Sequence, residues 1–243
     1  EQHFHRERFN DHRITHLLFN NVGAHGDGKD APFRRLFRER LRELVPAASA
    51  LGLPLVAVDS NLPEYLPIDF VRMHHALNAS VALVLQRKFS KYYYASGYSY
   101  FDCGMGTGDE VARLDPFAFH LLSTESLNCI ATGGQMARTE KTQVVADFSP
   151  SHGFLNVCVS ADAHGKNCAT CSKCMRTLMT LDILGKASRY DRVFDLEKFH
   201  ARRKSYIARL VFGSTGSLEN EIIELASSRG LLWGKLANLR RRL

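Results

Sequence analysis

The sequence predicts an α/β fold in which helices cover both faces of a parallel sheet. Short apolar runs alternate with stretches whose apolar residues recur at helical spacing, an order of elements typical of parallel sheets. Four cysteines gathered within residues 158–174 predict a metal-binding knuckle. Apolar residues at helical spacing in residues 217–243 predict a helical C-terminal extension.

Four short apolar runs predict the buried strands of the sheet. They cover residues 14–19, 53–58, 91–96 and 127–131, and most are followed by polar residues or glycine. Ligands of parallel sheets bind at the carboxyl ends of the strands. We therefore expect residues 20–28, 59–61 and 97–107 to surround one cleft.

Helical periodicity fills the segments between and after these strands. In residues 33–45 the apolar side chains share one face and arginines occupy the other, and Pro46 is expected to kink or divide this helix. The other predicted helices are residues 69–87, 139–148, 172–184 and 217–243. The glycine-rich residues 97–115 are expected to form a long loop.

Composition excludes several classes of protein. The chain has 243 residues, of which 45% are hydrophobic and 23% charged, which is typical of a globular protein rather than a disordered one. No apolar run approaches the ~18–20 residues that span a bilayer, and no signal segment opens the sequence. We expect a cytoplasmic protein without membrane contact.

Positive charge is concentrated near the C-terminus. The net charge is +7, and residues 202–243 contain nine basic residues against three acidic ones. We interpret this basic tail as a solvated helix face, and binding of an acidic partner or nucleic acid is the alternative. Leu231, Leu232, Trp233 and Leu236 are expected to pack on the chain's own core, and a homodimer contact is the alternative there.

Four of the six cysteines have the spacing of a zinc site. Cys168 and Cys171 form a Cys-x2-Cys knuckle, Cys174 is expected on the opening turn of a helix, and Cys158 is expected to come from a preceding strand. Four thiolates close the coordination shell, so the zinc ion would be structural. Gly165 and Asn167 are expected to let the loop fold back. Three basic residues are expected to offset the negative charge of the four thiolates: Lys166, Lys173 and Arg176.

The alternatives to zinc are weaker. Nothing indicates secretion, so a disulfide framework is disfavoured. A ferredoxin-type cluster would need a further cysteine where Leu178 stands, and a redox dithiol would not explain four grouped sulfurs. Cys103 and Cys129 are interpreted as small core residues.

The histidines give a weaker signal than the cysteines. His12 and His16 have the spacing of two metal ligands on a helix, but a strand is predicted to begin between them. His74 and His75 fall in the middle of a predicted helix. The sequence therefore does not favour a second metal site.

Three segments resemble one enzyme family. These segments are the knuckle followed by Met175-Arg176-Thr177-Leu178, YASGYSYFD at residues 94–102 and RTEKT at residues 138–142. They resemble the QueC-like (7-cyano-7-deazaguanine synthase-like) members of the PP-loop ATP pyrophosphatases. The resemblance runs from about residue 14 to residue 185. It implies a Rossmann-like (HUP/PP-loop) sheet in residues 1–157, with the zinc knuckle and C-terminal helices, residues 158–243, packed on it.

The resemblance also implies a reaction. Such enzymes use ATP with Mg²⁺ to adenylate the carboxylate of a substrate, and the adenylate is then converted into an amide or a nitrile. In this chain the implied substrate class includes deazaguanines. It implies catalytic roles for Asp102 toward a base edge and for Arg138 and Lys141 toward phosphate. The candidate nucleotide-binding residues are Asn20, Gly97, Tyr98, Gly104 and Gly106.

The sequence departs from this family at its phosphate-binding loop. PP-loop enzymes carry Ser-Gly-Gly-x-Asp-Ser after their first strand, and no such run occurs in this sequence. The glycines of residues 104–108 are a weak substitute for this phosphate-binding loop. We expect the strand and its loop to lie upstream of Glu1. The alternatives are a nucleic-acid-binding or tRNA-modifying zinc protein and an inactive PP-loop scaffold.

Overall fold

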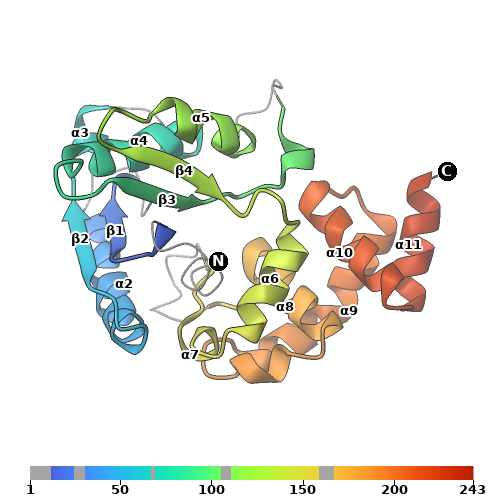
Figure 1. Cartoon of the computed structure of the whole chain (residues 1–243). Coiled ribbons are helices and arrows are strands. Elements are labelled where there is room, and N and C mark those ends of the chain that lie inside the picture. Colours follow the sequence, from blue (N-terminus) through green and yellow to red (C-terminus); the bar gives the residue numbers. More distant parts are fainter. Residues whose placement is uncertain (1–11, 25–30, 67–68, 105–110, 159–166, 243) are drawn as a thin grey trace. The chain divides into compact units, whose positions relative to one another are not determined.

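The structure, a computed structural model, describes residues 12–24, 31–66, 69–104, 111–158 and 167–242 (Figure 1). It divides into two compact units, Glu1–Gln135 and Met136–Leu243. The boundary expected after residue 157 falls inside the second of these units.

The strands of the first unit form two parallel pairs. β1 (Leu17–Asn21) pairs with β2 (Leu55–Asp59), and β3 (Lys91–Ala95) pairs with β4 (Asn128–Thr132). All four predicted strands are present, with ends shifted by up to three residues. Among the described residues they make two two-stranded sheets, whereas one continuous sheet was expected. The fold is therefore mixed α/β with short parallel sheets.

Helices pack on both faces of the β1–β2 pair. Side chains alternate between the faces of a strand, so neighbouring residues of β1 meet different helices. Phe19 stacks on Phe37 of α2 (Ala31–Ala50), with ring centroids 5.0 Å apart. Leu18 instead packs with Leu77 and Val81 of α4 (Phe70–Val84).

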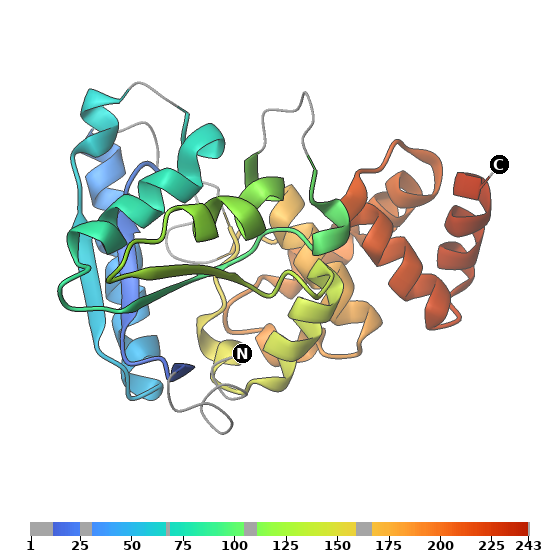
Figure 2. The ribbon, with the colours of Figure 1, turned by 45° about the horizontal axis from the view of Figure 1, so that its top comes forward.

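The β3–β4 pair is covered by α4 and α5 (Asp115–Leu121), as Figures 1 and 2 show. Phe119 of α5 is fully buried and stacks on Tyr94 at a centroid distance of 4.3 Å. Ala79, Leu127 and Cys129 complete this core, so the interpretation of Cys129 as a core residue is confirmed. The expected loop after β3 contains two 3-10 turns, Tyr100–Asp102 and Val111–Leu114.

Pro46 does not divide its helix. α2 continues past it to Ala50, which corrects the expectation of a division. Pro46 is exposed, so water can hydrate the carbonyl that loses its helical hydrogen bond. The short α3 (Leu62–Tyr65) follows β2.

The described part of the second unit is helical. Its helices are α6 (Arg138–Asp147), α7 (Ser151–Phe154), α8 (Ser172–Ile183), α9 (Leu196–Phe212), α10 (Ser217–Ser228) and α11 (Leu232–Arg242), with a 3-10 turn at Ala187–Tyr190. α8 is the centre of the core, because Leu178, Met179 and Leu181 are all fully buried. The hydrophobic effect thus stabilises this unit around the helix that follows the cysteine knuckle.

The C-terminal extension is two helices, whereas a single helix was expected. Gly230 has a φ of +79°, a backbone conformation that favours glycine, and it ends the α10 segment. α11 then packs back on α10: a Cβ atom added to Gly234 would lie 2.6 Å from the Cβ of Ala226 and from the backbone nitrogen of Ser227. Trp233 packs against the core as expected, while Leu232 and Leu236 are exposed.

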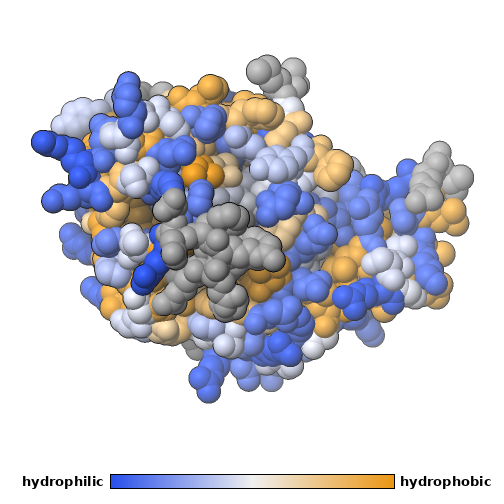
Figure 3. Space-filling view, in the orientation of Figure 1, coloured by the Kyte–Doolittle hydropathy of each residue, from blue (hydrophilic) through white to orange (hydrophobic). Residues whose placement is uncertain are grey.

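The face of the molecule drawn in the space-filling view has a mixed surface (Figure 3). Hydrophobic residues lie in small groups among hydrophilic ones in the space-filling view (Figure 3). Among the helices of the described ranges, none combines the length and the apolar character that a bilayer crossing requires.

Candidate metal centre

The structure brings the four predicted cysteine ligands together. The sulfur atoms of Cys158, Cys168, Cys171 and Cys174 all lie within 4.8 Å of one another, and those of Cys168 and Cys174 are 3.9 Å apart. Four sulfurs that bind one zinc ion at about 2.3 Å in a tetrahedron are about 3.8 Å apart. The cluster therefore has the size of a four-thiolate metal site.

The backbone of the knuckle is wrapped around two of these sulfurs. The N–H of Cys171 donates to Sγ of Cys168 at 3.3 Å, and the N–H of Cys174 donates to Sγ of Cys171 at 3.5 Å. Cys171 is also the N-cap of α8, so one sulfur both starts the helix and faces the cluster. The turn is made by Ala169, which is buried and has a φ of +59°. The expected hinge Gly165 lies outside the described residues.

Asn167 fixes Cys158 beside the knuckle. Its Oδ1 accepts hydrogen bonds from the N–H groups of Val157 and Cys158 at 2.8 and 3.1 Å. Its Nδ2 donates to the carbonyls of Leu155 and Val193 at 2.8 and 3.0 Å. Cys158 therefore comes from an irregular segment that one side chain holds in place. The expectation of a strand before Cys158 is therefore wrong. Asn167 was expected to give the loop freedom, but it acts as a brace that fixes the loop through its hydrogen bonds.

Two of the thiols differ in how readily they lose a proton. Burial raises the pKa of Cys168, but hydrogen bonds from Thr170, Cys171 and Cys158 outweigh it and lower the pKa to about 6. Burial raises the pKa of Cys174 above its usual range, and its hydrogen bond to Cys171 acts in the same direction. A cation at the centre would favour the thiolate form of all four, because metal binding releases the protons.

One of the three basic residues expected to offset the charge of the cluster forms an ion pair. Nη1 of Arg176 lies 3.2 Å from Oε1 of Glu219, so an ion pair within the helical unit uses this guanidinium. Lys173 is exposed on the first turn of α8, and Lys166 lies outside the described residues.

The first unit carries a polar cluster at the carboxyl ends of β1 and β2. Nδ2 of Asn20 donates to Oδ1 of Asn78 at 3.4 Å, and Nδ2 of Asn21 donates to Oδ1 of Asp59 at 2.6 Å. The Oδ1 atoms of Asn20 and Asn21 are both buried without a hydrogen-bond partner among the described residues. Asn20, Asn21 and Asp59 lie in segments that were expected to surround a cleft, and Asn20 was also a candidate nucleotide-binding residue. Asn78 was not predicted, because it lies within a helix and no sequence signal marked it.

The predicted residues after β3 form a tight turn. The carboxylate of Asp102 accepts from the hydroxyl of Ser99 at 2.8 Å and from its N–H at 3.4 Å. Tyr98 is buried, and the Arg113 guanidinium lies 5.0 Å from the centre of its ring. Asp102 thus has a local structural role whatever it binds. Gly97 is half-buried, Gly104 is exposed, and Gly106 lies outside the described residues.

Arg138 and Lys141 lie on the first turn of α6, in the second unit. Arg138 is exposed and Lys141 is half-buried. Glu140 caps this helix by accepting from the N–H of Ala137 at 2.7 Å, and Glu221 accepts from the N–H of Thr139 at 3.1 Å. The helix that carries the two predicted cations is thereby tied to α10.

Comparison of the chain with protein-family models, curated proteins and solved structures finds no match to any of them.

Proposed function

We propose that the chain is an ATP-dependent synthase or ligase that adenylates a carboxylate, with a structural zinc ion in its helical unit. The convergence of four cysteine sulfurs carries the proposal. It is the feature that the resemblance to QueC-like enzymes most specifically requires.

Zinc suits this cluster better than other metals. Thiolate ligands favour zinc over magnesium, calcium or manganese, which prefer oxygen ligands. With four sulfurs the shell has no position for water or substrate. The ion would therefore hold Cys158 and the knuckle against the start of α8, and the chemistry would take place elsewhere.

The polar ends of β1 and β2 support a nucleotide site in the first unit. Ligands of parallel sheets bind at this edge, and two buried amide oxygens there have no partner among the described residues. Such oxygens accept hydrogen bonds from hydroxyl or amino groups, which ribose and adenine both supply.

In the proposed reaction a carboxylate oxygen attacks the α-phosphorus of ATP. The bond from this phosphorus to the bridging oxygen breaks, and pyrophosphate leaves with the electron pair. Ammonia or an amine then attacks the acyl carbon and displaces AMP. Arg138 and Lys141 are the residues proposed to stabilise the charge on the leaving pyrophosphate.

This reaction also needs a phosphate-binding loop, and the sequence contains no Ser-Gly-Gly-x-Asp-Ser run.

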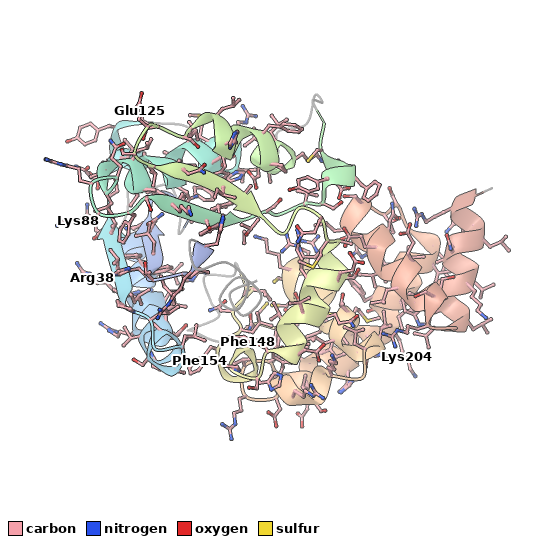
Figure 4. All side chains as sticks on the ribbon, viewed as in Figure 1. Arg38, Lys88, Glu125, Phe148, Phe154 and Lys204 are labelled. Carbon is pink, nitrogen blue, oxygen red and sulfur yellow. The ribbon has the colours of Figure 1, made fainter. Side chains whose placement is uncertain are left out.

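The test is pyrophosphate release by the full-length protein with MgATP and a panel of carboxylates, deazaguanine carboxylates included. We expect release that depends on one carboxylate, and a loss of at least ~10²-fold in kcat for Lys141→Met. The matched control is Lys204→Met, on the exposed face of α9 (Figure 4). Absence of pyrophosphate release with every carboxylate, or equal rates for both variants, would contradict the proposal.

A hollow on α2 favours nucleic-acid binding as a second candidate function. The hollow, of about 320 Å³, is lined by Arg34, Arg35, Arg38, Arg42 and Glu39. Two of these arginines, Arg34 and Arg35, pair with Glu64 and Glu39. In the basic tail Arg203, Arg240 and Arg241 likewise bond to Asp182, the carbonyl of Val211 and Glu224. Arg38 is exposed on α2 (Figure 4), so Arg38→Ala should weaken RNA binding and lower its salt slope by about 1. Binding that Arg38→Ala leaves unchanged would exclude the hollow as the site.

A further inference from the structure

Two histidines and an aspartate converge inside the first unit. His74 and His75 lie side by side in α4, and Asp115 is the first residue of α5. A ring nitrogen from each histidine and a carboxylate oxygen of Asp115 all lie within 4.8 Å of one another. Nε2 of His74 is 2.7 Å from Oδ1 of Asp115.

This cluster has unsatisfied hydrogen-bonding capacity. Asp115 is 1% exposed, and its Oδ2 has no hydrogen-bond partner among the described residues. Nδ1 of His75 is also buried without a partner there. Leaving a buried polar atom unpaired costs roughly 1–3 kcal/mol, and more for a charged group. The two orphan atoms therefore point to a missing binding partner.

Within the described ranges, the residues around Asp115 are largely aromatic and offer its carboxylate little other compensation. His74 stacks on Tyr94 with ring centroids 6.0 Å apart, and His75 meets Phe119 edge to face at 6.4 Å. Burial, and secondarily the charge of Asp115, raises the pKa of Tyr94 to about 12, so this phenol is neutral. Arg113, two residues before Asp115, lies over the ring of Tyr98.

The second ring nitrogen of His74 is held as in metal-binding histidines. Nδ1 of His74 lies 3.4 Å from the carbonyl oxygen of Val71, one turn earlier in α4. A histidine that binds a metal usually donates its other N–H to a carbonyl or carboxylate, which fixes the tautomer. Without a metal, a proton bridges Nε2 and Oδ1. A cation would replace this proton, and donation from Nδ1 to Val71 would then leave the lone pair of Nε2 for the metal.

We propose that His74, His75 and Asp115 form a second metal site, for a divalent transition-metal ion of the zinc class. Two imidazoles and one carboxylate suit zinc, cobalt or iron(II), whereas calcium and magnesium prefer oxygen ligands alone. Ligand atoms at about 2.0–2.1 Å from a tetrahedral ion are about 3.3 Å apart, so Nε2 and Oδ1 need to separate by only about 0.6 Å.

The proposed site differs from the cysteine site in kind. Three protein ligands leave one tetrahedral position for water or substrate, as in catalytic zinc sites, whereas four thiolates leave none. The sequence did not favour a second site because its ligands are 40 residues apart, with no metal-motif spacing. The proposal does not depend on ATP chemistry.

The test is titration of the metal-free full chain with Co²⁺, with bound metal counted after buffer exchange. We expect two cobalt ions per chain in the wild type and one in His75→Ala and in Asp115→Asn. The ion that remains should show the strong sulfur-to-cobalt absorption of the cysteine site. His120→Ala, an exposed histidine of α5, is the matched control and should bind two.

His75 is only half-buried, so His75→Ala decides the matter if Asp115→Asn does not fold. Circular dichroism of each variant checks the fold. A wild type that binds only the thiolate-ligated ion would overturn the proposal. So would a second ion that persists in His75→Ala.

Discussion

The cysteine cluster and the cluster of His74, His75 and Asp115 are held in contrasting ways. In the second unit the four cysteines lie within 17 residues of sequence, and Asn167 uses all four of its hydrogen bonds to place one of them. In the first unit His74 and Asp115 meet through the packing of α4 and α5, and two atoms of this cluster, Nδ1 of His75 and Oδ2 of Asp115, are unpaired among the described residues. The first arrangement is local and braced, and the second depends on tertiary packing.

This contrast predicts that the second unit is the more sensitive to loss of a ligand. Cys171→Ser removes a metal ligand, whereas a serine can still cap α8. The zinc ion of the cysteine site should be lost and the unit should unfold or aggregate, because structural zinc contributes roughly 10 kcal/mol or more. The measurement is zinc content with thermal unfolding. Cys103→Ser is the control and should keep its zinc. A zinc content of Cys171→Ser equal to that of the wild type would contradict the assignment.

Removal of the brace should have the next largest effect. Asn167→Ala deletes a buried side chain that makes four hydrogen bonds, and we expect a loss of about 3 kcal/mol in the free energy of unfolding, with weaker zinc binding. Asn167→Asp keeps the acceptor but loses the donor, so it should fall between Asn167→Ala and the wild type. Equal chelator resistance in all three proteins would show that Asn167 does not position Cys158.

The contact between α10 and α11 should come third. In Gly234→Ala the new methyl group meets Ala226 and the backbone of Ser227, so the helices must separate, at a cost of about 1–3 kcal/mol. Denaturant unfolding measures this cost. Gly153→Ala is the matched control, because nothing lies within 4 Å of its added Cβ. A Gly234→Ala protein as stable as Gly153→Ala would mean that the two helices do not pack this closely.

The smallest effect is expected at the surface ion pair of Asp147 and Lys186. The hydrogen bond from Lys186 lowers the pKa of Asp147 below its ordinary value. The pair therefore stabilises the folded state above the unfolded pKa, near 3.8, and this contribution is lost as pH falls through the lowered folded pKa. Lys186→Met should be slightly less stable than the wild type at pH 7, and urea unfolding should show the gap closing in acid. A gap that widens in acid would reverse the assigned sign.

What the sequence predicted follows the same division between local and long-range features. The cysteine ligands and the four strands were predictable because spacing and short apolar runs are local signals. α9 was not predicted, although Phe199, Tyr206 and Leu210 are buried at helical spacing. The pairing of the strands and the meeting of α4 with α5 depend on contacts distant in sequence. The ion pair of Arg176 with Glu219 does so too, and no local pattern encodes these contacts.

The most direct test of the central claim is X-ray absorption at the zinc edge of the His75→Ala protein, in which only the cysteine site should hold metal. We predict one zinc ion per chain with four sulfur neighbours at about 2.3 Å. A protein without zinc, or a zinc ion with fewer than four sulfur neighbours, would contradict the account.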